Sequence, residues 1–270
     1  MLKRFTTLSP QKNMLFLSFL LPMFVMMVIY ATMGVYPFGN STLLTVDLGQ
    51  QYVDFFSYYR TTLLSDPSAL FFSFTKSFGG EMLGLWAYYL MSPFNLIFLL
   101  FPKSQLPLAV TILILMKVSA SGLTFAHLLI SRFEGKGLLV PSFAVSYALM
   151  GYVIVNQLNV MWLDGLVFLP LIILGLEKLL SGESGLYYSL FLAVMLLSNY
   201  YIGFMICVFL VFYYLFAFSR QELVSTNNLK AQLKHFFTQS ARFIGYSLLG
   251  AGFAAVLLLH TFYSLLGSKA

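Results

Sequence analysis

Long apolar runs alternate with short polar segments along the whole chain. Seven of these runs approach the length that a helix needs to cross a bilayer, which is about 20 residues. They cover residues 14–35, 106–130, 138–156, 165–180, 186–198, 203–218 and 243–263. The pattern predicts an all-α polytopic membrane protein with about seven transmembrane helices.

A polar break interrupts the apolar sequence between residues 186 and 218. One continuous helix there, at about 1.5 Å per residue, would exceed a hydrocarbon core of about 30 Å. The break runs Ser-Asn-Tyr-Tyr-Ile-Gly from Ser198 to Gly203. We therefore expect a tight turn between two shorter helices.

Residues 83–101 form a further apolar run, and the basic residues decide how to interpret it. If this run does not cross, most Lys and Arg residues fall on the side of the N-terminus. The positive-inside rule makes that side cytoplasmic. Pro93, Asn95 and the Trp86-Ala87-Tyr88-Tyr89 start also favour an interfacial or re-entrant segment. We expect residues 37–105 to form the first extracytoplasmic loop, with interfacial helices.

Composition supports a single transmembrane domain over residues 1–270. The chain is 60% hydrophobic and 9% charged, which is too little charge for a soluble surface. The net charge of +6 then reports topology, and no nucleic-acid partner is expected. Residues 14–35 are predicted to be a retained signal anchor, and residues 106–263 to hold the remaining spans.

The predicted outer loop gathers four of the nine acidic residues, Asp47, Asp54, Asp66 and Glu81. Asp47 and Asp54 are seven residues apart, a spacing that places them on one face of a helix. Two such carboxylates could supply a general base, bind a divalent cation, or solvate the helix. Asp66 precedes a proline and is interpreted as a turn residue.

Other polar residues occur where an apolar chain rarely has them. Arg60 and Lys76 lie in the same loop and could pair with its acids or hold a phosphate. Lys117 lies inside a span, where a charge is costly, so it could neutralise a lipid-linked phosphate or pair with a buried acid. Trp162 and Asp164 begin the next span, and Asn199 and Tyr200 lie in the polar break.

Several chemistries lack their sequence motifs. The chain has no phosphate-binding glycine loop and no nucleophile elbow, and one cysteine with three histidines gives no zinc pattern.

Five short segments carry a resemblance to a known family. They begin at Asp47 (DLGQQYVDFF), Ser77 (SFGGEM), Ser92 (SPFN), Met161 (MWLDG) and Ser198 (SNYYIG). With these segments the chain resembles the YfhO family of bacterial membrane proteins over nearly its whole length. The resemblance implies a GT-C-like glycosyltransferase in the cell membrane. It also implies that the chain is the N-terminal portion of a longer protein.

The resemblance further implies partners and roles. The donor would be a sugar linked to polyprenyl phosphate, and the acceptor a cell-envelope polymer such as lipoteichoic acid. Asp47 would be the catalytic base, with Asp54 the next candidate, while Arg60, Lys76 or Lys117 would offset the charge of the leaving phosphate. The remaining predicted substrate-binding residues are Gln50, Tyr52, Glu81, Trp162, Asp164, Asn199 and Tyr200. A transporter of lipid-linked sugars and a non-catalytic membrane scaffold are the alternatives, and the need for a divalent cation stays open.

Overall fold

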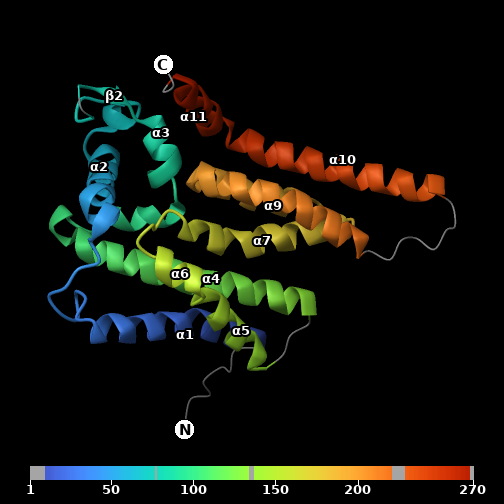
Figure 1. The fold of residues 1–270 in the computed structure, drawn as a ribbon, viewed down its shortest axis with the longest axis horizontal. Helices are drawn as coiled ribbons and strands as arrows, with labels where there is room; N and C mark the ends of the chain where they lie inside the picture. Colours follow the sequence, from blue (N-terminus) through green and yellow to red (C-terminus); the bar gives the residue numbers. More distant parts are fainter. Residues whose placement is uncertain (1–9, 77, 134–136, 221–228, 268–270) are drawn as a thin grey trace, which may run out of the picture.

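The computed structural model describes residues 10–76, 78–133, 137–220 and 229–267, and these are almost entirely helical (Figure 1). The helices outside the segment between α1 and α4 largely follow the apolar runs, because a chain inside a bilayer must satisfy its backbone groups internally. They are α1 (Pro10–Thr32), α4 (Leu106–Phe133), α5 (Leu139–Ala148), α6 (Gly151–Asn156), α7 (Leu163–Leu180), α8 (Leu186–Ser198), α9 (Tyr200–Ser219), α10 (Leu229–Phe253) and α11 (Ala255–Gly267).

Four of the described helical segments are long and apolar enough to cross a membrane. They are Gln11–Thr32, Lys103–Phe133, Leu139–Asn156 and Tyr200–Ser219, and α10 with α11 make a fifth if that bent pair counts as one span. The multi-pass membrane architecture is therefore confirmed, while the predicted count of seven spans is not.

Close helix crossings hold the bundle together at glycines. A Cβ on Gly122 of α4 would lie 2.5 Å from the Ser18 carbonyl oxygen of α1. A Cβ on Gly175 of α7 would lie 2.6 Å from Cα of Tyr188 in α8. Small residues let helix backbones approach in this way, which increases van der Waals contact where the surrounding lipid gives no hydrophobic drive. A side chain at either glycine would push two helices apart.

The turn predicted in the polar break is confirmed. Helix α8 ends at Ser198 and α9 begins at Tyr200. Between them Asn199 accepts a hydrogen bond from the Ile202 backbone N–H at 2.8 Å, which caps α9.

Two of the expected segments differ from the structure. The run at 138–156 is long enough to span, as predicted, but it consists of two helices, α5 and α6, joined at Leu149 and Met150. The last apolar run predicted a span that starts at residue 243. The structure has instead one helix from Leu229 to Phe253, which bends by 75° into α11. Hydropathy alone places the start of a span where the apolar residues begin, although the helix itself continues through the polar residues before them.

The segment between α1 and α4, which we call the covering segment, covers one end of the bundle, with α11 beside it (Figure 1). It contains a π-helical turn (Leu48–Tyr52), α2 (Val53–Leu64), a 3₁₀ turn (Pro67–Leu70) and a small hairpin of β1 (Phe72–Ser73) and β2 (Gly80–Glu81). Four short helical pieces follow: α3 (Leu83–Leu85), a π-helical turn (Trp86–Leu90), a 3₁₀ helix (Pro93–Leu99) and a 3₁₀ turn (Lys103–Gln105). Residues 83–101 thus contain no single helix of spanning length.

The hydrophobic core connects this segment to the bundle. Phe56 of α2 stacks on Phe98 with ring centroids 4.2 Å apart, and both side chains are buried. Burial of such aromatic side chains fixes the position of the covering segment on the ends of the helices.

Candidate functional site

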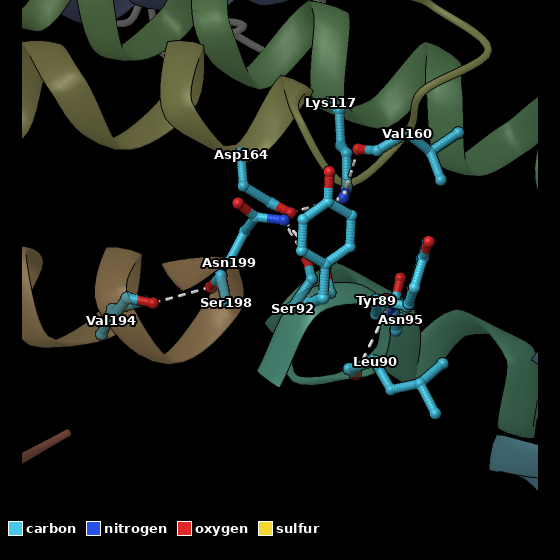
Figure 2. Close-up of polar contacts among 11 residues, drawn as sticks. Tyr89, Leu90, Ser92, Asn95, Lys117, Val160, Asp164, Val194, Ser198 and Asn199 are labelled. Carbon is cyan, nitrogen blue, oxygen red and sulfur yellow. Dashed lines mark hydrogen bonds and ion pairs between the residues drawn. The ribbon is translucent and has the colours of Figure 1, made fainter. Parts of the chain in front are cut away.

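A buried ion pair joins α4 to α7. Nζ of Lys117 lies 2.8 Å from Oδ2 of Asp164, and neither side chain is exposed (Figure 2). Lys117 also donates to the Val160 carbonyl oxygen at 2.9 Å. The remaining Asp164 oxygen, Oδ1, accepts from the Ser92 hydroxyl at 2.8 Å. The sequence left two roles open for Lys117, and the structure shows the pairing with a buried acid.

This pairing gives the ion pair a positioning role. A buried charge is tolerated when it is paired and its other polar atoms are hydrogen-bonded. Here both carboxylate oxygens of Asp164 have donors, one from α4 and one from the covering segment. The pair therefore fixes Ser92, and with it the covering segment, against α4 and α7.

Two buried asparagines hold the π-helical turn Trp86–Leu90. Asn199 donates from Nδ2 to the Tyr88 carbonyl oxygen at 2.8 Å. Asn95 donates to the carbonyl oxygens of Tyr89 at 2.9 Å and Leu90 at 3.1 Å (Figure 2). Partners outside the turn thus bind its carbonyls and fix its orientation. Asn95 and Ser92 were not among the predicted site residues. The sequence feature that could have indicated them is a polar residue within an apolar run.

The turn presents Tyr88 and Tyr89 to an aromatic cluster. The Tyr88 ring lies 4.6 Å from Tyr89 and 5.6 Å from Tyr200, and Tyr89 lies 5.2 Å from Tyr52, measured between centroids. Trp162 donates from its indole nitrogen to the Tyr88 hydroxyl at 3.1 Å. Tyr52, Trp162, Asn199 and Tyr200, predicted from separate segments, therefore lie together around Tyr88 and Tyr89.

Asp47 lies at the edge of this aromatic cluster with an exposed side chain. The Tyr52 hydroxyl faces it across 3.5 Å, which is long for a hydrogen bond, and lies 3.3 Å from Oδ1 of Asn159. The pKa of Tyr52 is raised to about 12. Burial is the largest cause, followed by electrostatic interactions with Tyr89 and Asp47. The phenol is therefore protonated at neutral pH and can donate a hydrogen bond beside a carboxylate.

Asp47 and Asp54 have different neighbours, contrary to the expectation of a shared helix face. The first turn after Asp47 is π-helical, with more residues per turn than an α-helix, so the seven-residue spacing no longer aligns the two side chains. Asp47 faces Tyr52, whereas Asp54 lines a cavity with Lys76 and Lys103. Gln50, within the π-helical turn, is exposed.

An apolar groove of about 320 Å³ lies beside the aromatic cluster. Its walls come from α6, α7 and α9, and include Tyr152, Leu166, Leu169, Ile202 and Ile206. Trp162 lines the groove and also donates to Tyr88, so the groove reaches the aromatic cluster at this residue. Such a groove can take a hydrocarbon chain, with its polar end among the tyrosines.

The other predicted residues contact neighbouring polar groups. Arg60 donates from Nε to the Phe101 carbonyl oxygen at 2.7 Å. Oε1 of Glu81 accepts from the Gly84 N–H at 2.9 Å and lies 2.9 Å from Nε2 of His260 in α11. Lys76 donates to the Glu81 carbonyl oxygen at 2.6 Å. Within the described ranges, no three His, Cys, Asp or Glu side chains form a metal-ligand group.

Comparison with known proteins gives a family but no characterised relative. No curated protein matches the chain, and no solved structure does. The model of the family described as "Bacterial membrane protein YfhO" matches residues 18–270, which is nearly the whole chain. With its multi-pass helical fold and the match over that length, the chain belongs to the YfhO family of bacterial membrane proteins.

Proposed function

We propose that this protein is a membrane glycosyltransferase of the GT-C type. It would move a sugar from a polyprenyl-phosphate donor to a cell-envelope polymer such as lipoteichoic acid, on the extracytoplasmic face. The observation that carries the proposal is the junction at Trp162. There an apolar groove meets an aromatic cluster with an exposed carboxylate, Asp47, at its edge. A lipid-linked sugar has the same two parts, one apolar and one polar.

The groove between α6, α7 and α9 would hold the first part of the prenyl chain. Removing apolar surface from water gains about 25 cal/mol per Å², although a chain that starts in the bilayer gains less. The walls of the groove therefore act mainly by holding the prenyl chain in position. Trp162, apolar along most of its ring and polar at its nitrogen, suits the boundary between lipid and headgroup.

Asp47 would act on the acceptor. Its carboxylate takes the proton from an acceptor hydroxyl while that oxygen forms a bond to the anomeric carbon of the donor sugar. The bond from the anomeric carbon to the phosphate oxygen breaks, and its electron pair leaves with polyprenyl phosphate. The configuration at the anomeric carbon is inverted. General base action of this kind contributes about 10²–10⁴-fold to the rate.

The leaving phosphate would be contacted by groups of the aromatic cluster. Lys117 was the first intramembrane candidate, but its ammonium donates to Val160 and Asp164 within the protein. Tyr52, with its pKa of about 12, keeps its proton at neutral pH and can donate to a phosphate oxygen. Tyr200 provides a second phenol at the same cluster.

The test is transfer of a labelled sugar from a polyprenyl-phosphate donor in membranes containing the protein. The proposal expects label in an extracytoplasmic polymer, dependent on the protein. If labelled donor crosses the bilayer without transfer, the protein is a transporter. If neither occurs, while partner proteins lose function in its absence, it is a scaffold. In the transporter alternative Lys117 would be a charge that lines a path, and its burial against Asp164 gives that role no support.

A further inference from the structure

Opposite charges line one cavity without pairing to each other. The cavity has a volume of about 480 Å³ and lies between α2, the β hairpin, the start of α3 and the turn that precedes α4. Asp54, Lys76 and Lys103 all line it. Asp54 and Lys103 make no hydrogen bond or ion pair with any residue that the structure describes, and Lys76 uses its ammonium only toward the Glu81 carbonyl oxygen. A carboxylate and two ammonium groups line this one cavity. They suit a ligand that carries both an anionic group and a hydrogen-bond donor.

The other walls suit a carbohydrate or polyol. Phe55 and Tyr58 line the cavity with ring surface, and Tyr58 directs its hydroxyl to the Ala69 carbonyl. Thr61 and Thr75 contribute hydroxyl oxygens. Thr61 donates to the Ser57 carbonyl oxygen at 2.9 Å and retains its capacity to accept. Aromatic faces contact C–H surfaces, while carboxylates and hydroxyls bind hydroxyl groups.

The cavity adjoins the aromatic cluster through a single side chain. Phe55 lines the cavity, and its ring lies 4.9 Å from that of Tyr89. Tyr89 in turn contacts Tyr52, which faces Asp47. The cavity therefore meets the cluster at Phe55 of α2, whereas the apolar groove reaches the cluster through Trp162.

We propose that this cavity binds the acceptor, and that the acceptor is a phosphate-bearing polyol or sugar chain. Lys76 and Lys103 bind the phosphate, and Asp54 accepts a hydrogen bond from a neighbouring hydroxyl. Phe55 and Tyr58 contact the carbon backbone of the chain. The assignment of this ligand as the acceptor rests on the proposed transferase function, whereas the chemical class of the ligand rests on the cavity alone. Asp54 then orients the acceptor, and Asp47 remains the base.

The test is calorimetric binding of two probes, glycerol 3-phosphate and inorganic phosphate, to the full chain in nanodiscs. The wild-type protein is expected to bind glycerol 3-phosphate more tightly than inorganic phosphate. Lys103→Gln should weaken both by about tenfold, since a hydrogen bond to a charged group is lost. Asp54→Ala should remove the preference for glycerol 3-phosphate. Lys12→Gln, which changes an exposed lysine of α1, is the matched control and should change neither affinity.

Three results would overturn the proposal: no binding of either probe by the wild type, equal binding by wild type and Lys103→Gln, or an unchanged preference in Asp54→Ala. Thermal unfolding of each variant shows whether the fold is retained, and both positions have exposed side chains. Failure here is separable from failure of the proposed function. If the protein transfers sugar but Lys103→Gln does not change probe binding, the cavity proposal fails and the transferase function stands. If Lys103→Gln weakens probe binding but the protein transfers no sugar, the transferase function fails and the cavity proposal stands.

Discussion

Lys117 of α4 and Asp164 of α7 form a completely buried ion pair, with Nζ and Oδ2 separated by 2.8 Å. Their positions differ by 47 residues in the chain. Through the Ser92 hydroxyl, the same carboxylate also holds the segment that carries Tyr88 and Tyr89. The stability of the bundle and the geometry of the aromatic cluster therefore depend on one buried carboxylate.

Asp164→Asn should destabilise the protein by about 3–5 kcal/mol, because Lys117 would be left as a buried charge without its partner. The double variant Lys117→Met, Asp164→Leu should recover most of that loss, since no buried charge remains. Thermal unfolding in detergent measures both. Equal destabilisation of the single and double variants would mean that the pair does not act as a unit.

The double variant also separates stability from positioning. The double variant should fold, because no buried charge remains. It should transfer sugar more slowly than the wild type, because the Ser92 hydroxyl loses its acceptor. A double variant with normal stability and normal transfer would show that the Ser92 contact does not position the aromatic cluster.

Asn199→Ala should lower the stability by about 1 kcal/mol through loss of the α9 cap, with a further loss from the Tyr88 contact. The larger effect is expected on sugar transfer, because Tyr88 connects Trp162 to the other tyrosines. Ser198→Ala is the matched control, since Ser198 donates only to Val194 of its own helix. The comparison is transfer rate at matched protein amount, and equal rates for the two variants would count against the role of Asn199.

The helical pattern of this chain follows from its hydropathy. The polar break at Ser198–Gly203 was sufficient to predict the turn that Asn199 caps. Trp162, Asn199 and Tyr200 were predicted as substrate-binding residues from separate segments. They meet around Tyr88.

The contacts that define the site were beyond the sequence, for physical reasons. Pairing of Lys117 with Asp164 depends on which helices pack together, and hydropathy does not encode that. The π-helical turn after Asp47 has the same composition as an α-helical turn, so the separation of Asp47 from Asp54 could not be predicted. Asn95 indicated only an interfacial or re-entrant segment, and the buried contacts of Ser92 and Asn95 show that they hold the covering segment.

Leu169→Trp should fill the apolar groove and raise the KM for the lipid-linked donor by about tenfold, with little change in kcat, because uniform binding of the prenyl chain is lost. Val208→Trp is the control, as Val208 of α9 is exposed and does not line the groove. The measurement is initial rate against donor concentration. An unchanged KM in Leu169→Trp would place the prenyl chain elsewhere.

Tyr52 should titrate near its raised pKa of about 12, and Asp47→Asn should lower that pKa, because the negative charge of Asp47 contributes to the shift. Burial is the larger cause and persists, so the pKa should stay above the ordinary value of about 10. Tyrosinate absorbance, compared with Tyr52→Phe, isolates the signal. An identical titration in wild type and Asp47→Asn would mean that the two side chains do not interact.

The assignment of Asp47 as the base is tested most directly by comparing Asp47→Asn with Asp66→Asn in the transfer assay. Asp66 is a second exposed acid of the same segment, and it accepts a hydrogen bond from Ser68 in a turn. Donor binding is measured in parallel. We predict that Asp47→Asn lowers kcat by about 10²–10⁴-fold with donor affinity retained, while Asp66→Asn transfers normally. Undiminished transfer by Asp47→Asn would contradict the assignment.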